Sequence, residues 1–474
     1  MTTQLRSLLC ALGTAACLSL HAHAEAAKDI TGSVRIETTG LTAGQTAFTD
    51  GKISTHGGGA NVSFTLSSDL PMGGLSIVYN AVPEPGTLDG RTTIAAYGFL
   101  HEYISLNGAL SAVLFYPQAD ICEIRAYSVG ELPADVQRWE PGGADTDLML
   151  FATHSDDDQL FFAGLLPYYT SRGARVQVAY FINHYDTYNR THELLDGLWH
   201  CGVTRYPEIS PFPDGYSESA AGAADFLVSK GFTREDCVSF QRTLLDTYKP
   251  LVAVLHDTKG EYGHGAHILN TATFLEACEN ASDGNHIPDK IYIHLYPENT
   301  LTLDIDTPLA AYDGKTAFQV SQEAFRFHKS QHWTWFYEWL YGKNDSRSAA
   351  SQIRSYNPAK YGLYATRVGA DSGVGDMLEN IVTYAEREQE AKRLEEQRQK
   401  EEEARREQER LKQLAAEEQA RAKALEAEND RLAARQKRNK NMITGVILLT
   451  GIAALAAVFL SIASKKRGRR SKKR

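Results

Sequence analysis

The strongest constraint on the fold is a pair of polar motifs that come at the ends of two apolar runs. The first motif, Thr153 to Asp158, follows the run Leu148 to Phe151, and the second, Glu261 to His267, comes shortly after Leu251 to Leu255. Short apolar runs of this kind are typical of buried strands. In an open α/β sheet, polar groups beyond the carboxyl ends of the strands meet in one crevice. The sequence therefore predicts such a sheet, with both motifs at the same edge.

The region from 146 to 345 alternates between strand-like and helix-like segments. The expected strands are 148–151, 175–181, 251–255 and 291–295. The expected helices are 159–171, 191–200, 219–230, 234–248, 264–279 and 316–330. This alternation predicts a Rossmann-like α/β domain, in which a parallel sheet carries helices on both faces.

Residues 28 to 140 show a different pattern, with short alternating runs separated by turns rich in Gly, Pro and Asp. The expected strands include 32–37, 61–66, 75–79, 109–115 and 121–128. Many short strands predict a β-sandwich. The segment Phe48 to Thr55 resembles part of the galactose-binding-like, or discoidin, jelly roll. That resemblance implies binding of a glycan or a surface and, in some members, a structural Ca²⁺ ion. A β module that only packs on the next domain is the alternative.

The first 24 residues have the composition of a secretory signal peptide. Arg6 supplies the positive charge, Leu8 to Leu20 is apolar, and His21 to Ala24 ends in the small-x-small pattern that signal peptidase cuts. We therefore expect residues 1–24 to be removed and the following part of the chain to be exported.

Residues 380 to 440 are composed mainly of Glu, Arg, Lys, Gln and Ala and contain no Gly or Pro, which predicts a long charged helix. Opposite charges recur four residues apart, as in Glu401 and Arg405. Leu411, Leu425 and Leu432 keep a seven-residue register that Glu418 interrupts. A single charged helix and a coiled coil that joins copies of the chain are both compatible with this pattern. Either would act as a stalk.

The stretch Met442 to Ser464 is apolar and carries no charge, and its length is enough to span a bilayer as one helix. The basic tail 465–474 follows it and is expected to stay in the cytoplasm. A basic tail can also indicate nucleic-acid binding, but next to an apolar span membrane anchoring is the better interpretation. The sequence therefore predicts a single-pass membrane protein with its bulk outside the cytoplasm and no nucleic-acid partner.

The two polar motifs offer histidine nitrogens and carboxylate oxygens at close spacing, which are ligands that zinc accepts. His154-Ser155-Asp156-Asp157 resembles the HPDD(E) signature of the GlcNAc-PI de-N-acetylase family, also called the PIG-L or LmbE-like deacetylases. Tyr262 to His267 resembles the later HxxH signature of that family. Arg190 to Glu193 and His328 to Gln331 match it as well, so the resemblance covers about 190 residues.

The resemblance implies a zinc-dependent deacetylase, with another divalent ion as an alternative metal. The metal ligands that it implies are His154, Asp157 and His267. Three protein ligands leave a position for water, whose pKa zinc lowers.

The remaining roles also follow from the resemblance. It implies that Asp156 is the general base, that His264 stabilises the oxyanion, and that Tyr262 helps to polarise the acetyl carbonyl. Arg190, Asp214 and His328 are implied substrate contacts. An exposed salt bridge is the alternative for Arg190 and Asp214, and a structural role is the alternative for His328.

Three departures from the family pattern need attention. Ser155 stands for the usual proline, Asp158 for glutamate, and Gly265-Ala266 for a frequent Pro-Asp pair. None of them removes a ligand or the base, so we expect an active enzyme. His256-Asp257 follows a strand near the site and is expected to support it.

Together these features predict a membrane-anchored zinc de-N-acetylase. It would act on a GlcNAc-type amino sugar in a surface glycan or glycolipid. A surface glycan-binding or adhesive protein with a vestigial deacetylase domain is the alternative, and a hydrolase for another amide is a third. The aromatic residues between Trp333 and Trp339 can stack on sugars or pack in the core.

Overall fold

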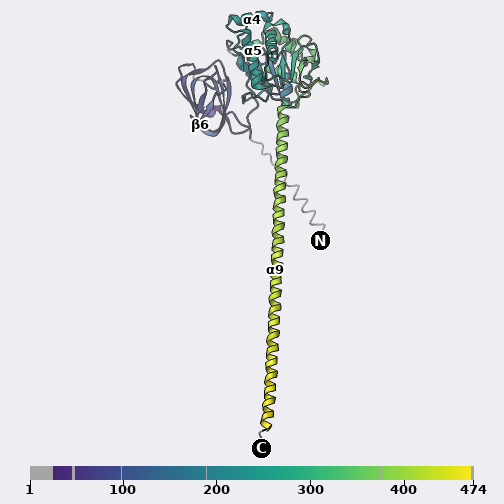
Figure 1. Ribbon diagram of the computed structural model, residues 1–474. Helices are drawn as coiled ribbons and strands as arrows, with labels where there is room; N and C mark the ends of the chain where they lie inside the picture. Colours follow the sequence, from purple (N-terminus) through teal and green to yellow (C-terminus); the bar gives the residue numbers. More distant parts are fainter. Residues whose placement is uncertain (1–24, 45–47, 98, 188, 374, 471–474) are drawn as a thin grey trace. The chain divides into compact units, whose positions relative to one another are not determined.

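The computed structural model describes residues 25–44, 48–97, 99–187, 189–373 and 375–470 (Figure 1). The predicted signal peptide lies outside these residues. The chain divides into two compact units, Met1–Arg387 and Glu388–Arg474. The first unit contains two sheets, and the second contains most of one long helix.

The N-terminal module is all-β, as predicted. Its strands are β1 (Val34–Thr39), β2 (Ala43–Gly44), β3 (Gly57–Tyr79), β4 (Gly86–Leu88), β5 (Thr92–Ile94) and β6 (His101–Ser128), preceded by the 3-10 turn η1 (Thr31–Ser33). They form one sheet in the order β1-β3-β6-β4-β5, with β2 beside β3. Strands expected separately at 61–66 and 75–79 belong to β3, and those at 109–115 and 121–128 to β6. The two-sheet sandwich stays a prediction.

Alternation along β3 explains how this module forms a core. Val62, Phe64 and Leu66 are fully buried, while Thr65 between them is exposed. The ring of Phe48 packs edge-on against Phe64 with 5.2 Å between the centroids. One face of the strand therefore supplies the apolar surface that stabilises the module.

The second sheet has seven strands. They are β7 (Leu148–Ala152), β8 (Val176–Tyr180), β9 (Glu208–Ile209), β10 (Val252–Leu255), β11 (Lys290–His294), β12 (Thr300–Thr302) and β13 (Lys360–Thr366). Their order is β12-β13-β11-β10-β7-β8-β9. The neighbours from β11 to β9 pair in parallel, which confirms the predicted parallel sheet for this part. Strand β13 pairs antiparallel with β11 and β12 at the edge, and it follows the range in which the sequence predicted strands.

Helices cover both faces of this sheet, as predicted. They are α2 (Leu165–Thr170), α3 (Arg190–His200), α4 (Ala220–Ser229), α5 (Arg234–Tyr248), α6 (Gly265–Glu279), α7 (Ala317–Phe325) and α8 (Trp335–Tyr341), with 3-10 turns η2 (Glu261–Gly263), η3 (Ala310–Tyr312), η4 (Lys329–Gln331), η5 (Lys343–Asp345) and η6 (Ala350–Gln352). Leu148 and Leu150 of β7 share a core cluster with α2, α3 and α7. Met149 and Phe151 share another with α5 and α6. A strand between two helical layers must be apolar on both faces, which explains its continuous apolar run.

Two helix predictions were wrong in extent. The helix expected at 159–171 begins only at Leu165, because residues 155–164 form consecutive turns and Gly164 has a left-handed φ of 87°. The helix expected at 316–330 ends at Phe325. Both changes leave irregular backbone close to the candidate site residues.

A hydrogen-bonded chain links the β module to helix α3. The ring of His192 on α3 lies 2.9 Å, Nδ1 to Nε2, from that of His101 on β6, and His101 Nδ1 lies 2.7 Å from Gln137 Oε1. Gln137 Nε2 in turn donates to Asp196 Oδ1 at 2.6 Å. These partners assign a proton to His192 Nδ1 and leave its buried Nε2 without a partner among the described residues. The contact therefore holds His192 in its neutral form.

We expect the substitution His192→Asn to flatten the pH dependence of stability. Burial, helped by His101, lowers the pKa of His192 to about 3, whereas the unfolded side chain titrates near 6.5. Below pH 6.5 the unfolded state binds a proton on this side chain that the folded state does not. The free energy of unfolding therefore decreases by about 1.4 kcal/mol for each unit by which the pH is lowered. Asparagine keeps an N–H donor but does not titrate. Urea unfolding between about pH 4 and 6.5 should show a slope smaller by this amount, and equal slopes would contradict the assignment.

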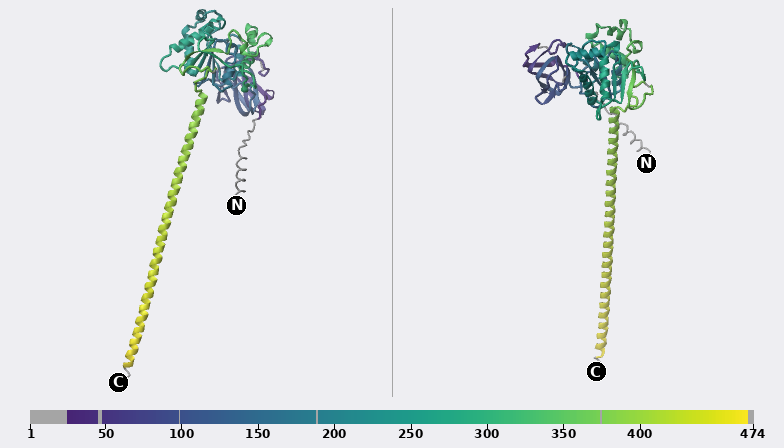
Figure 2. Two further views of the ribbon diagram at one scale, coloured as in Figure 1. Left: turned by 90° about the vertical axis from the view of Figure 1, so that its right-hand side faces the viewer. Right: turned by 45° about the horizontal axis from the view of Figure 1, so that its top comes forward.

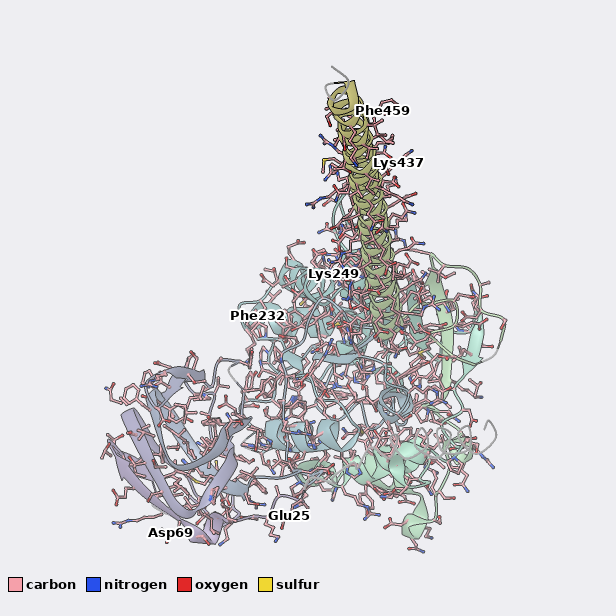
Figure 3. The ribbon with its side chains drawn as sticks, turned by 90° about the horizontal axis from the view of Figure 1, so that it is seen from below. Glu25, Asp69, Phe232, Lys249, Lys437 and Phe459 are labelled. Atoms are coloured by element: carbon pink, nitrogen blue, oxygen red, sulfur yellow. The ribbon has the colours of Figure 1, made fainter. Side chains whose placement is uncertain are left out.

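The second unit is dominated by α9, which runs from Tyr384 to Arg470 as one continuous helix (Figures 1 and 2). It takes in the predicted stalk and the predicted span. Its most apolar window has a mean hydropathy of 2.6 and is not buried, so α9 is long and apolar enough to cross a membrane. Lys437 and Phe459 both point away from the helix axis (Figure 3). Its orientation in a membrane and its pairing with other copies stay predictions.

Candidate metal centre

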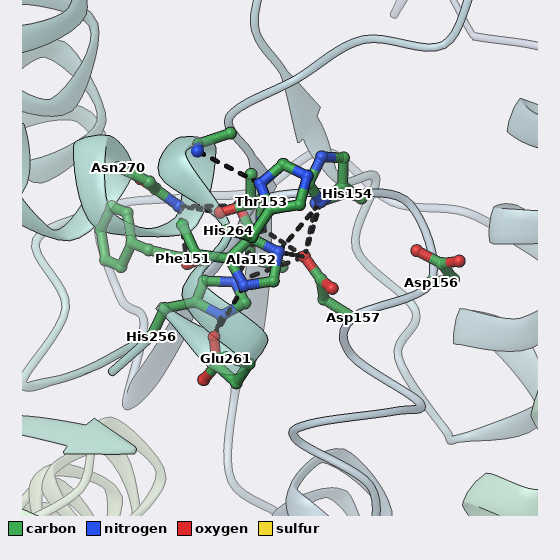
Figure 4. Close-up of polar contacts among 12 residues, drawn as sticks. Phe151, Ala152, Thr153, His154, Asp156, Asp157, His256, Glu261, His264 and Asn270 are labelled. Carbon is green, nitrogen blue, oxygen red and sulfur yellow. Dashed lines mark hydrogen bonds and ion pairs between the residues drawn. The ribbon is translucent and has the colours of Figure 1, made fainter. Parts of the chain in front are cut away.

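The two polar motifs meet at one edge of the second sheet, as the sequence predicted. His154 lies just beyond the carboxyl end of β7, and His256 directly follows β10, the parallel neighbour of β7. His264 caps the N-terminus of α6, and His267 lies in the first turn of that helix. The carboxyl ends of two adjacent strands and the start of one helix therefore build the site (Figure 4).

A buried amide fixes helix α6 against strand β7. Asn270 Nδ2 donates to the carbonyl oxygens of Phe151 and Ala152, both at 3.1 Å, and contacts Thr153 Oγ1 at 3.0 Å (Figure 4). Gln241 on α5 donates to Asn270 Oδ1 at 2.7 Å. These bonds join α6, which carries His267, to the end of β7, which precedes His154. They therefore set the distance between the two motifs.

Three electron-rich atoms converge in the site, and they belong to the three predicted ligands. His154 Nδ1 lies 3.1 Å from His267 Nε2, and Asp157 Oδ2 lies 3.4 Å from each of these nitrogens. All three side chains are buried.

The opposite ring nitrogens decide what faces the centre of this triangle. His154 Nε2 lies 3.5 Å from Asp214 Oδ1, and His267 Nδ1 lies 2.7 Å from Glu261 Oε2. A nitrogen that faces a carboxylate carries a proton, so the other nitrogen of neutral His267 presents a lone pair, and Nδ1 of His154 presents one when that ring is neutral, as a metal ligand must be. Two lone pairs and a carboxylate oxygen this close repel one another unless a cation lies among them. A carboxylate behind each histidine is also the usual arrangement at metal sites.

The charges of these residues fit a metal ion. Burial raises the pKa of Asp157, but His267 and His256 outweigh it, so the pKa lies well below the ordinary value and the carboxylate is ionised. Burial lowers the pKa of His267 to about 4, which keeps its lone pair available. Burial also disfavours a charged His154, yet Asp157 and Asp214 raise its pKa to about 10, so the site favours a positive charge. Two imidazoles and one carboxylate suit zinc.

Two other histidines lie close enough to be considered as ligands. Besides the group formed by His154, Asp157 and His267, the described residues offer His154 with His264 and His267, and Asp157 with His256 and His267. His256 Nε2 accepts the Thr153 N–H at 3.0 Å, so this nitrogen is occupied. None of these groups lies in residues 28–140, so among the described residues the Ca²⁺ predicted there has no such cluster.

The buried carboxylate of Glu261 contacts three histidines. Its Oε2 lies 2.8 Å from His256 Nδ1 and 2.7 Å from His267 Nδ1, and its Oε1 lies 2.6 Å from His294 Nδ1. All four side chains are fully buried. The pKa of Glu261 is raised by burial but lowered further by His256 and its other hydrogen-bond partners, so the net shift is well below the ordinary value. The ionised carboxylate therefore fixes the orientation of His267.

Asp156, the predicted base, lies to one side of the three converging atoms and has no polar contact with them (Figure 4). Its Oδ1 lies 3.2 Å from Arg190 Nη2 at the start of α3, and both side chains are buried. The pKa of Asp156 is raised, because burial outweighs the nearby Arg190 guanidinium. A carboxyl with a raised pKa is better matched to proton transfer near neutral pH than an ordinary aspartate.

His264 presents a hydrogen-bond donor beside the site. Its Nδ1 accepts the Ala266 N–H at 3.2 Å, so the proton of the neutral ring lies on Nε2. Burial and the neighbouring His154 lower the pKa of His264 to about 3, so the ring stays neutral. A neutral N–H of this kind can bind a developing oxyanion without prior rearrangement.

Tyr262 packs against His264 from a strained backbone position. Its φ of 47° lies in the left-handed region, and its ring centroid is 5.4 Å from that of His264 and 5.8 Å from that of His267. Such strain persists only when the surroundings impose it, and it is common at functional sites. Burial raises the pKa of Tyr262 above its ordinary value, so its hydroxyl stays protonated and can donate.

One departure from the family pattern, Gly265, has a structural explanation. A Cβ on Gly265 would lie 2.2 Å from the Ser219 carbonyl oxygen, because the loop before α4 passes directly over the start of α6. Only glycine fits there. Asp158 is buried, its Oδ2 accepts a hydrogen bond from Gln159 at 2.6 Å, and burial raises its pKa well above the ordinary value.

Several buried nitrogens near Arg190 have no hydrogen-bond partner among the described residues. They are both ring nitrogens of His184, both of His328, and Nε of Arg190. Burial lowers the pKa of His184 to about 3, and with Arg190 it keeps the pKa of His328 well below its ordinary value, so both rings are neutral. An unsatisfied buried polar group costs about 1–3 kcal/mol, so this cluster is expected to meet polar groups of a ligand or water.

Sequence reasoning brought together the residues predicted as ligands and base but missed His184, His294 and the position of Glu261. His294 is the last residue of β11, and His184 follows β8 by a few residues. The rule that located the two motifs, polar residues after a buried strand, applies to these strands as well. Nothing in the sequence indicates that Glu261 contacts three histidines, because His294 is distant from it along the chain.

No protein-family model and no curated protein matches this chain. Among solved structures it is similar to N,N'-diacetylchitobiose deacetylase from Pyrococcus horikoshii, with 12% identity, a TM-score of 0.32, and 46% of this chain and 84% of that one covered. It is also similar to the zinc-inhibited form of teicoplanin deacetylase Orf2, with 15% identity, a TM-score of 0.28, and 42% and 88% covered. A third is GalB, the 4-carboxy-2-hydroxymuconate hydratase of Pseudomonas putida KT2440, with 14% identity, a TM-score of 0.32, and 48% and 99% covered. TM-scores this low carry no argument about activity, which must be argued from the site itself.

Proposed function

We propose that this protein is a metal-dependent de-N-acetylase, with zinc as the expected metal. The observation that carries the proposal is the convergence of His154 Nδ1, Asp157 Oδ2 and His267 Nε2 within 3.4 Å of one another. A structural zinc site usually has four protein ligands, whereas three are typical of a catalytic one. These residues would hold the ion, which when bound polarises a carbonyl group and lowers the pKa of water.

The residues around the triangle supply the proton transfers of amide hydrolysis. Asp156 takes a proton from the attacking water and gives it to the leaving nitrogen as the C–N bond breaks, so the products are acetate and an amine. The 3.2 Å ion pair with Arg190 holds this carboxylate in place. His264 Nε2–H and the Tyr262 hydroxyl donate to the acetyl oxygen, on which negative charge develops.

The unpartnered nitrogens beside the base favour a sugar as the substrate. A neutral imidazole offers one donor and one acceptor, which matches the two hydrogen-bonding roles of a hydroxyl. Arg190 is already paired with Asp156, and Asp214 lies 3.7 Å from His184 Nε2, so the cluster has no excess positive charge for an anion. We therefore propose that Arg190, Asp214 and His328, with His184, bind sugar hydroxyls. The N-acetylglucosamine type follows from the resemblance of the motifs.

The location of the substrate follows from the two ends of the chain. Residues 1–24 are proposed to direct export, the apolar part of α9 to anchor the protein, and its charged part to act as a stalk. The basic tail would remain in the cytoplasm. An enzyme placed in this way meets glycans or glycolipids of the cell surface rather than soluble metabolites. Pairing of stalks between copies is compatible with this arrangement.

The proposal is tested by metal content and acetate release together. The full chain, purified in detergent without chelator, is expected to contain one zinc per chain and to release acetate from N-acetylated amino sugars. The substitution His154→Ala should lower both, because it removes a ligand. An inactive His154→Ala protein that retains all of its zinc would contradict the ligand assignment. Wild-type protein that binds no metal would favour the adhesive alternative.

A further inference from the structure

The aromatic segment that contains α8 has a buried part and an exposed part. Phe336 and Trp339 pack on the fully buried Phe161, with centroids 5.8 and 5.5 Å apart. Trp333, in contrast, is 84% exposed and Trp335 is 49% exposed. Core packing therefore accounts for the first pair but not for the two exposed tryptophans.

One of the exposed tryptophans, Trp335, adjoins the candidate site, and Trp333 lies two residues before it in the chain. The ring of Trp335 meets that of Tyr262 edge-on, with 5.7 Å between the centroids, and Tyr262 in turn contacts His264. On another side of His264 lies Tyr216, which is 67% exposed and whose ring centroid is 5.3 Å away. Exposed aromatic surface is thus continuous with the group that faces the reacting amide.

The indole nitrogens distinguish these tryptophans from the others. The N–H groups of Trp139, Trp199 and Trp339 donate to protein oxygens at 2.7 to 3.0 Å. Those of Trp333 and Trp335 donate to no protein group in the described part of the chain. Each therefore offers an apolar face and a free donor, a combination that suits a ligand with both C–H faces and hydroxyls.

The surroundings argue against a lipid or an aliphatic protein surface as the ligand. Throughout 189–373, a fully described stretch, most of the large apolar side chains that are exposed are aromatic: Tyr216, Phe327, Trp333, Trp335 and Tyr364, with Val228 and Val368 as the aliphatic ones. A surface for acyl chains would be expected to expose mainly Leu, Ile or Val. A pyranose ring has an apolar face bordered by hydroxyls and needs only aromatic rings with polar groups at their edges.

We propose that Trp333 and Trp335 form a stacking subsite for the sugar rings next to the one that is deacetylated. This inference rests on the proposed function and narrows its substrate class to oligomers or polymers of an N-acetylated amino sugar. The hydroxyl-binding cluster near Arg190 would hold the reacting sugar, and the tryptophans would hold its neighbours.

The test compares N-acetylglucosamine with its tetramers, linked β-1,4 or β-1,6, using the full chain in detergent micelles. The wild type is expected to prefer a tetramer, and Trp333→Ala with Trp335→Ala should lower the tetramer-to-monomer ratio of kcat/KM about tenfold, through KM. Trp333→Ala alone is informative if the double variant folds poorly, because a highly exposed side chain contributes little to stability. Tyr364→Ser, which removes an exposed aromatic on β13, should leave the ratio unchanged.

Binding of the same sugars, measured by calorimetry, separates the subsite from the proposed function. Tetramer binding that the tryptophan variants weaken, without acetate release by any form, would support the subsite and contradict the deacetylase. Acetate release with equal kcat/KM for monomer and tetramers would contradict the subsite and leave the deacetylase standing. An unchanged ratio in the variants, or no binding and no release, would overturn the subsite.

Discussion

The substitution Asp156→Asn is expected to lower kcat for acetate release by about 10²–10⁴-fold, the usual contribution of a general acid or base. Asparagine has nearly the shape of aspartate and can still contact Arg190, but it cannot accept the proton of water. Asp156 has no polar contact with the three proposed ligands in Figure 4, so the zinc content should remain that of the wild type. The measurement pairs steady-state rates with the metal content of the same preparations.

Asp225→Asn is the matched control, because Asp225 is an exposed aspartate on α4. It should change neither the rate nor the metal content. A variant Asp156→Asn that loses its zinc together with its activity would make Asp156 a ligand instead. If Asp156→Asn kept most of its activity, Asp156 would not be the general base.

The substitution Glu261→Gln should weaken both metal binding and the fold. Three histidine nitrogens lie 2.6 to 2.8 Å from this carboxylate, and the amide of glutamine would place an N–H against one of them. Loss of the group that orients a metal-binding histidine typically lowers metal affinity about 10- to 100-fold. Removal of one member of a buried ionic cluster costs about 3–5 kcal/mol of stability.

Competition with a chelator measures the first effect, and urea unfolding of the metal-free protein measures the second. Glu235→Gln, on the exposed side of α5, is the control and should resemble the wild type in both. If Glu261→Gln retained zinc affinity and unfolded at the wild-type urea concentration, the carboxylate would not hold His267 in place.

The parallel part of the sheet was predictable because burial on both faces leaves a continuous apolar run in each strand. The polar motifs after the runs that form β7 and β10 then predicted that His154 and His267 lie at one edge of the sheet. The antiparallel strand β13 was not predicted. It pairs with β11 and β12 through backbone hydrogen bonds, and these bonds leave little trace in the sequence of the strand.

The turns between Ser155 and Gly164 show a second limit. Their apolar residues Leu160 to Ala163 predicted an early start of α2, and all four are indeed buried. Burial alone does not distinguish a helix from packed turns, and the left-handed Gly164 separates the two. The choice depends on the surrounding helices and therefore on the complete fold.

What the sequence alone determined is local: the strands, the motifs at their ends, the charged helix and its apolar continuation. Each of these depends on residues that are close along the chain, whose periodicity and composition are visible without coordinates. The tertiary structure alone decided which groups stand behind the proposed ligands. Glu261 joins His256, His267 and His294, and Asp214 faces His154, because distant strand ends and loops converge on one buried volume. Contacts of this kind arise from packing, and packing is a property of the whole fold.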